Sequence, residues 1–274
     1  MVEAMEKVLG VFDAEALRER FERAGVFEVV AQRGFSDPQI EIVTAGQAIP
    51  HVHLYGRKDR QRHLLLEACL SETVVRPAFF AARGFPVDSP ICLAVAYWVR
   101  EQDPTRPFRA DRPRLPLQRH PGLGALRRAF RVITGMAIDL GKDGVACMPK
   151  FFHDAHIFYR SRLFLFLDPA EQGRFEALIR DLRTLSLRDA SLALLNGAVG
   201  DRDGLPVSWH PGYQVFPLSQ RLTAYFNSPK YEQTVVEQMN LCNFDCNRQL
   251  LSPLHGHIDA EDITGLVAGA ERAL

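Results

Sequence analysis

Apolar residues recur at helical spacing in several parts of the chain. Asp13 is a suitable N-cap for a helix over residues 13–24, in which Leu17 and Phe21 share one face. Residues 123–140 show the same three- and four-residue spacing, and Gly141 is a typical C-terminal stop. Further helices are predicted at residues 78–83, 151–162, 169–182, 187–199, 218–226, 231–241 and 260–273.

Short runs rich in Val, Ile and Leu, separated by turn residues, predict strands. Four runs precede residue 71 and are expected to form an antiparallel meander. The longest apolar run, residues 91–99, lies between Pro90 and a proline-rich loop at residues 103–116. The full set of expected strands is 27–32, 39–44, 51–55, 63–70, 91–99, 145–148 and 163–167.

The order of these elements predicts an α/β (α+β) protein with a mixed, largely antiparallel sheet flanked by helices. After residue 168 the pattern becomes mainly helical. We therefore expect an α/β domain over residues 1–168 and a helical C-terminal module over residues 169–274.

Composition narrows the classes of partner. The chain has 33 basic and 33 acidic residues, so its formal net charge is zero and no long-range field attracts a nucleic acid. The N-terminus lacks the apolar segment of a secretory signal, and the longest apolar run is too short to span a bilayer. Five cysteines at irregular positions suit a reducing compartment, where most are expected to be buried. We expect a cytoplasmic protein without a nucleic-acid or membrane partner; a homodimer is compatible with the sequence.

A glycine-containing turn at residues 119–124 precedes the helix at 123–140. Backbone amides at the start of a helix lack intrahelical partners and favour anions, and glycine lets a phosphate approach the main chain. A dinucleotide-binding fingerprint needs a third glycine where the chain has Arg127, and the P-loop needs a Gly-Lys-Ser/Thr sequence that is absent. The turn thus predicts a site for a phosphorylated ligand of another kind.

The sequence Arg119-His120-Pro121-Gly122-Leu123-Gly124 resembles the acyl-CoA-binding segment Gln/Arg-x-x-Gly-x-Gly/Ala of the GCN5-related N-acetyltransferase (GNAT) superfamily. In that family the turn follows a long central strand, and a later helix carries an alanine and, four residues on, a tyrosine. Ala155 and Tyr159 have this separation. Leu163 replaces a usual glycine and Phe152 a common asparagine, and the loop before the turn is unusually long, so the chain resembles a divergent member.

The resemblance implies a transferase that uses acetyl-CoA or another acyl-CoA to acylate an amine, either a small molecule or a peptide. The strands at 91–99 and 145–148 would diverge to admit the pantetheine arm. Tyr159 would protonate the leaving thiolate, and Glu101 would accept the proton of the amine, with His120 and then His153 as alternatives. No metal is assigned. The residues implied in cofactor binding are Arg119, His120, Pro121, Gly122, Leu123, Gly124, Ala125 and Arg127.

Paired histidines favour a different hypothesis, a histidine-ligated metalloprotein. His51 and His53 alternate along an expected strand, and His153 and His156 share a helix face. His255 and His257 form a third pair, but spacing alone identifies no carboxylate to complete a site. A catalytically inactive GNAT-like binding module is the third hypothesis.

Two further motifs are weaker. Cys242 and Cys246 have the spacing of the first two ligands of an iron–sulfur motif, but Gln249 stands where the third cysteine is needed. Residues 209–213 combine aromatic and turn residues, which suits a pocket lining, an interface or a packed loop.

Overall fold

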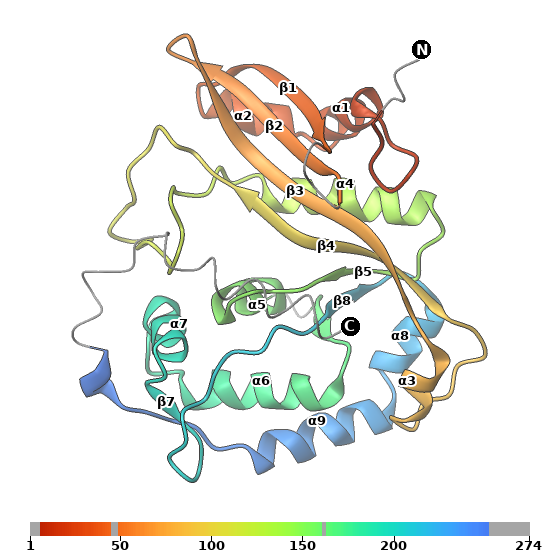
Figure 1. The fold of residues 1–274 in the computed structure, drawn as a ribbon, viewed down its shortest axis with the longest axis vertical. Coiled ribbons are helices and arrows are strands. Elements are labelled where there is room, and N and C mark those ends of the chain that lie inside the picture. Colours follow the sequence, from red (N-terminus) through yellow and green to blue (C-terminus); the bar gives the residue numbers. More distant parts are fainter. Residues whose placement is uncertain (1–5, 45–48, 161–162, 252–274) are drawn as a thin grey trace. The chain divides into compact units, whose positions relative to one another are not determined.

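The computed structural model describes residues 6–44, 49–160 and 163–251 (Figure 1). The helices are α1 (Ala14–Arg23), α2 (Val26–Gln32), α3 (Pro77–Ala81), α4 (Leu126–Asp139), α5 (Phe152–Tyr159), α6 (Pro169–Asp181), α7 (Leu187–Leu195), α8 (Gln220–Phe226), α9 (Pro229–Leu241) and a 3-10 turn, η1 (Arg248–Leu250). The strands are β1 (Ser36–Val43), β2 (His51–Lys58), β3 (Gln61–Val75), β4 (Ile91–Glu101), β5 (Gly144–Cys147), β6 (Leu165–Phe166), β7 (Val199–Gly200), β8 (Gln214–Pro217) and β9 (Asp245–Cys246).

The chain forms two compact units that alternate along the sequence. Of the described residues, the first unit contains 6–44, 49–107, 120–148 and 215–226, and the second contains 108–119, 149–160, 163–214 and 227–251. The division is discontinuous, whereas the sequence predicted two consecutive segments that meet after residue 168.

The first unit is built on a mixed sheet in the order β1-β2-β3-β4-β5-β8. Strands β1 to β4 are antiparallel neighbours, and β5 is parallel to β4. A two-residue turn, Asp59-Arg60, joins β2 to β3 with both residues at positive φ. The structure therefore confirms a mixed α/β fold with a largely antiparallel sheet flanked by helices.

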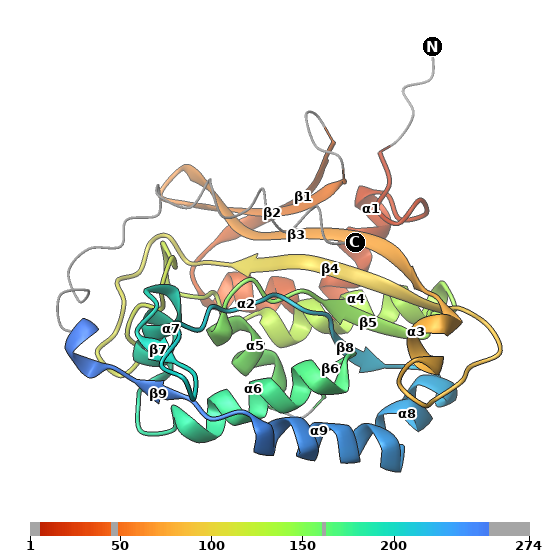
Figure 2. The same ribbon diagram turned by 60° about the horizontal axis from the view of Figure 1, so that its bottom comes forward.

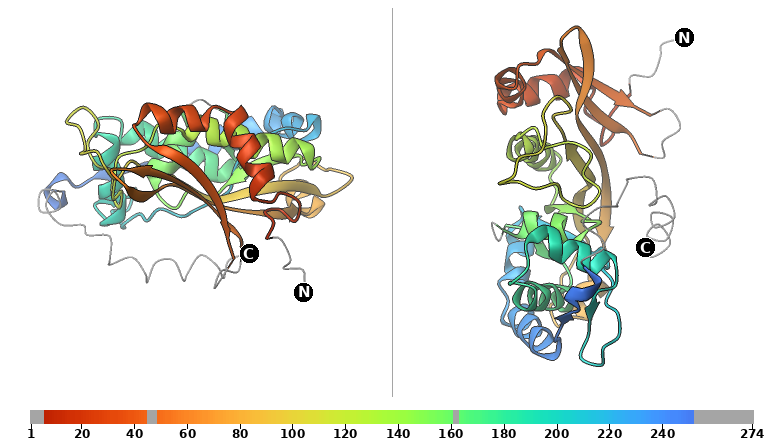
Figure 3. Two further views of the ribbon diagram at one scale, coloured as in Figure 1. Left: turned by 90° about the horizontal axis from the view of Figure 1, so that it is seen from above. Right: turned by 90° about the vertical axis from the view of Figure 1, so that its left-hand side faces the viewer.

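Helices α1, α2 and α4 cover one face of this sheet (Figures 2 and 3). Alternate residues of the strands, such as Val52 and Leu54 of β2, are buried with the apolar faces of the helices in one core. Because side chains alternate along a strand, His51 and His53 project from the opposite face. The sheet thus has an apolar face under the helices and a second face that carries polar groups.

The second unit is mainly helical. Helices α6 and α9 lie side by side (Figures 1 and 2). The two helices are close at Gly173, where an added Cβ atom would clash with the carbonyl oxygen of Val235. An aromatic core that includes Phe152, Phe175 and Trp209 packs beside the helices.

One expected strand is a helix. The valine-rich composition of residues 27–32 predicts a strand, but these residues belong to α2. Gly25 adopts a left-handed conformation and begins the helix, and Val26, Val29 and Val30 are buried at helical spacing. The meander consequently begins at β1. The helix expected at residues 260–273 lies outside the described residues.

Within the described parts of the chain, no helix combines the length and the apolar character needed to cross a bilayer.

Candidate functional site

The glycine-containing turn lies directly before α4, as the sequence predicted. Gly124 has φ +91°, a conformation that glycine adopts readily, and Leu126 is the first helical residue. Gly122 and Gly124 are exposed, while Leu123 and Ala125 are buried in the core. Residues 120–125 belong to the first unit and Arg119 to the second, so the predicted cofactor-binding segment crosses the boundary between units.

The side chain of Glu101 accepts hydrogen bonds from the backbone amides of this turn. Its Oε1 accepts a hydrogen bond from the Gly124 amide at 3.1 Å, and its Oε2 accepts one from the Ala125 amide. Burial raises the pKa of Glu101 above its usual range, although hydrogen bonds from these amides and the charge of Arg33 act to lower it. Glu101, predicted as a catalytic base, thus caps the N-terminus of α4 in this structure.

Two other contacts hold the turn in place. The Arg33 side chain donates from Nε to the carbonyl oxygen of Leu123 at 2.8 Å. The backbone amide of Asp103 donates to the carbonyl oxygen of Pro121 at 2.7 Å. The turn is therefore fixed by the end of α2 and by the residues that follow β4. Arg127 is exposed on the first turn of α4, and His120 is half-buried.

Strands β4 and β5 pair over only part of β4. The parallel register runs from Leu93 opposite Gly144 to Ala96 opposite Cys147, where β5 ends. Strand β4 continues for five residues, 97–101, of which 98–101 pair with β3 on the other side. Among the described residues of the first unit, no strand pairs with that edge, which leads to Glu101 and the turn.

Tyr159, the predicted proton donor, lies at the end of α5 in the second unit. Its hydroxyl donates to Glu176 Oε1 at 2.7 Å, and Gln172 Nε2 donates to the same oxygen at 2.8 Å. The ring packs edge-on against Phe175. Phe152, in the place of a family asparagine, is buried in the aromatic core, whereas Leu163 is 53% exposed.

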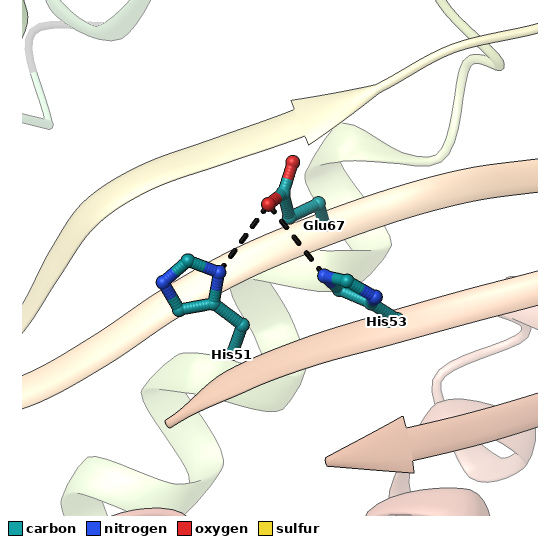
Figure 4. Close-up of side chains that lie close together, drawn as sticks. All are labelled: His51, His53 and Glu67. Carbon is teal, nitrogen blue, oxygen red and sulfur yellow. Dashed lines mark ion pairs between the residues drawn. The ribbon is translucent and has the colours of Figure 1, made fainter. Parts of the chain in front are cut away.

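A second group of chemically active side chains lies on the face of β2 and β3 opposite the helices (Figure 4). His51, His53 and Glu67 present one potential ligand atom each, and these atoms all lie within 4.8 Å of one another. Glu67 Oε1 is 3.3 Å from His51 Nδ1 and 3.5 Å from His53 Nε2. The carboxylate that spacing did not reveal is supplied by the neighbouring strand, since Glu67 is directly opposite His53.

The other histidine and cysteine pairs do not form such a group within the described part of the chain. His153 is buried in α5, and burial lowers its pKa to about 4; the pKa of His156 is also lowered by burial. Cys242 and Cys246 are half-buried rather than buried and lie beyond the end of α9, not on one helix. His255 and His257 fall outside the described residues.

In the loop at residues 209–213, Trp209 donates from Nε1 to the carbonyl oxygen of Pro149, as in a packed loop.

Comparison with known proteins places the chain in no family: it matches no protein-family model and no curated protein sequence.

Proposed function

We propose that this protein is an acyl-CoA-dependent N-acyltransferase that transfers an acyl group, such as acetyl, to an amine. One observation carries the proposal: beyond Ala96, the edge of β4 that faces away from β3 has no partner strand in the described part of the first unit, and it leads to a turn whose main-chain amides hold the carboxyl group of Glu101. A strand edge beside an anion-binding turn offers hydrogen bonds to the amides of a pantetheine arm and charge stabilisation to the pyrophosphate beyond it.

The Glu101 carboxylate supports an anion site at this turn. The amides of Gly124 and Ala125 converge on its two oxygens, and the Arg33 guanidinium lies beside Gly124. The same donors suit a phosphate oxygen, because charge-assisted hydrogen bonds from amides stabilise either anion. The residues of the turn therefore fit a pyrophosphate, provided that the carboxylate gives up its place.

Displacement of Glu101 has a chemical consequence. The carboxylate loses two hydrogen bonds that lower its pKa. Their loss raises the pKa of Glu101 further, which makes its carboxylate a stronger base. Occupation of the turn would thus release Glu101 to act at the end of β4.

The residues then have separate tasks in the transfer. Bound acyl-CoA supplies an activated thioester. The turn and the edge of β4 orient it, and Glu101 accepts the proton of the attacking amine as the new C–N bond forms. The C–S bond breaks and the sulfur takes up a proton, a role that the resemblance gives to Tyr159, whose hydroxyl donates to Glu176 within the second unit. The assignment of Tyr159 rests on the resemblance to the acetyltransferase motif.

Thermal unfolding with acetyl-CoA tests the site. Acetyl-CoA at about 100 times its Kd should stabilise the full chain by ~2.7 kcal/mol. A Cβ atom on Gly122 would lie 3.0 Å from Glu101 Oε1, so Gly122→Leu should fill the anion position and abolish this shift. Gly135→Ala is a matched control within α4, where the new methyl group meets only the end of Arg20 at 4.0 Å. The absence of a shift with the native protein would contradict the proposal.

Glu101→Gln separates binding from chemistry. Because the amide side chain competes less strongly for the turn than a carboxylate, the variant should bind acetyl-CoA more tightly in a calorimetric titration. It should also release less free thiol in the presence of acceptor amines, because it lacks the base. Binding without thiol release by the native protein, across a broad amine panel, would instead favour a non-catalytic acyl-CoA-binding module.

A further inference from the structure

The polar face of the sheet carries a row of charged and titratable side chains across four strands. In the strand register, Glu41 of β1 is opposite His53, His53 is opposite Glu67, and Glu67 is opposite Arg100 of β4. His51 lies two residues before His53 on the same face. The two histidines therefore lie beside the carboxylate of Glu67, and antiparallel pairing fixes the backbone of all three residues.

The contacts within this group are poor hydrogen bonds. Charge-assisted bonds are usually about 2.7–2.9 Å long, whereas both imidazole nitrogens lie 3.3–3.5 Å from the same carboxylate oxygen. His53 Nε2 is fully buried and has no hydrogen-bond partner among the described residues. An unsatisfied buried nitrogen is costly, so the arrangement is suited to a group that would occupy the space between the three atoms.

Two of the three separations match the edges of a coordination tetrahedron, and the third, between the two histidine nitrogens, is within 4.8 Å. Nitrogen and oxygen ligands about 2.0–2.2 Å from a zinc ion are about 3.3–3.6 Å apart when the geometry is tetrahedral. His51 Nδ1 and His53 Nε2 are at these distances from Glu67 Oε1. A divalent cation would bring the three lone pairs to one centre and satisfy the nitrogen that is otherwise unpaired.

Neighbouring residues already orient the three side chains. Tyr55 OH is 3.1 Å from His53 Nδ1, the nitrogen on the far side of the ring from Glu67. Arg100 contacts Glu67 Oε2, which leaves Oε1 for the two histidines. The His51 ring packs edge-on against Trp98, with ring centroids 5.0 Å apart. Such outer contacts are typical of metal sites, in which they set the orientation and the tautomer of each ligand.

We propose that His51, His53 and Glu67 bind a divalent transition-metal ion, zinc in the first instance, with water in the remaining position. Two imidazoles and one monodentate carboxylate are a ligand set that zinc accepts in sites with an open position. The inference is independent of acyl-CoA binding, because its residues lie on β2 and β3 and none belongs to the turn before α4.

Zinc binding by the full chain tests the proposal directly. Protein treated with a chelator and then supplied with Zn²⁺ alone should retain one ion per chain after gel filtration, as measured by elemental analysis. Cobalt(II) should give the intense visible absorption typical of a low-coordinate nitrogen and oxygen site. A protein that retains no zinc and gives no such spectrum contains only an ion-pair network, and the proposal is then wrong.

Substitutions locate the ion. Glu67→Gln keeps the shape of the side chain but removes its charge. Glu67→Gln and His53→Gln, each as a single substitution, should lower zinc affinity at least about tenfold. His63→Gln is the matched control, since His63 lies on the same strand pair but packs against Phe35. Tyr55→Phe should weaken binding less and alter the cobalt spectrum, because it changes only the orientation of His53. Equal zinc affinity in the native protein and all four variants would overturn the assignment.

Discussion

At the scale of single residues, burial gives His153 and its neighbour Asp154 unusual titration behaviour. Burial lowers the pKa of His153 to about 4 and raises that of Asp154 to about 7. Between these values both side chains are predominantly uncharged. His153 destabilises the fold as pH decreases from about 6.5 to 4, because only the unfolded chain gains a proton in that range. Asp154 destabilises the fold as pH rises from about 4 to 7, because only the unfolded chain loses a proton there.

The pKa of His153 can be measured by NMR titration of its ring protons, and we expect a value of about 4. The ring stacks on Phe151 with centroids 5.4 Å apart, so Phe151→Ala should admit water and raise the pKa toward 6.5. Ile157→Ala, at an exposed position of the same helix, should leave the titration unchanged. A native pKa near 6.5 would show that burial does not control this residue.

Residue types were easier to predict than their partners. Glu101 lies just after the long apolar run at 91–99, and the structure brings its side chain to the predicted turn, where Oε1 accepts a hydrogen bond from the amide of Gly124, 23 residues further along the chain. The partner of Tyr159, Glu176, belongs to another helix and had no signal in the sequence. Local patterns locate a side chain on an element, but contacts between elements depend on packing that the pattern does not contain.

At the scale of elements, a β-bulge determines which face carries Glu67. From the turn, Lys58 pairs with Gln61, and the pairing proceeds regularly to Tyr55 opposite Leu64. The register then shifts, so that Leu54 is opposite Leu66 and His53 opposite Glu67. Without the additional residue, His53 would face Leu66 and Glu67 would point into the core. The histidine pair was visible in the sequence, but its carboxylate depended on this irregularity.

The misassigned helix has a similar explanation. Residues 27–32 are rich in valine, which favours strands, and this composition outweighed the helical spacing of Val26, Val29 and Val30. The longer elements are placed correctly, but their bounds differ, most clearly in two: the strand expected at 63–70 extends over 61–75, and the helix expected at 187–199 ends at Leu195 before strand β7.

Close packing of α6 and α9 gives a prediction for the second unit. A methyl group at Gly173 would clash with the backbone oxygen of Val235 in α9, so Gly173→Ala should destabilise the protein by about 1–3 kcal/mol. Gly135→Ala in α4 meets no such obstacle and should stabilise it by about 0.5–1 kcal/mol, because alanine favours helices. Denaturant unfolding measures both. A Gly173→Ala variant that is more stable than the native protein would contradict the close helix contact.

At the scale of the whole molecule, the two units are interleaved, so neither is a continuous piece of chain. Residues 215–226 return to the first unit after most of the second. Arg221 in this segment binds Asp143, at 2.8 Å to Oδ1 and 2.6 Å to Oδ2, and Leu222, Tyr225 and Phe226 are buried. Burial acts to raise the pKa of Asp143. Hydrogen bonds from Arg221, the Cys92 amide and Ser219 outweigh this effect, so the pKa is lowered below its usual value.

A chain that ends at residue 168 should therefore fail to form a stable first unit. It lacks β8, α8 and the partner of Asp143, which leaves the edge of β5 and a buried carboxylate without their contacts. We expect aggregation in gel filtration and no cooperative thermal transition, in contrast to the full chain. A monomeric, cooperatively melting fragment would show that the boundary expected from the sequence is a true domain boundary.

The return of residues 215–226 also has a consequence for biosynthesis. Strand β5 is complete at residue 147, but the segment that covers its edge ends at residue 226. At a translation rate of about 5–20 residues per second, the ribosome needs roughly 4–16 s to make the intervening chain. During that interval an apolar strand edge is exposed on the nascent polypeptide. Slower translation or loss of chaperones that bind nascent chains should therefore lower the yield of this protein more than that of a protein of similar size with consecutive domains.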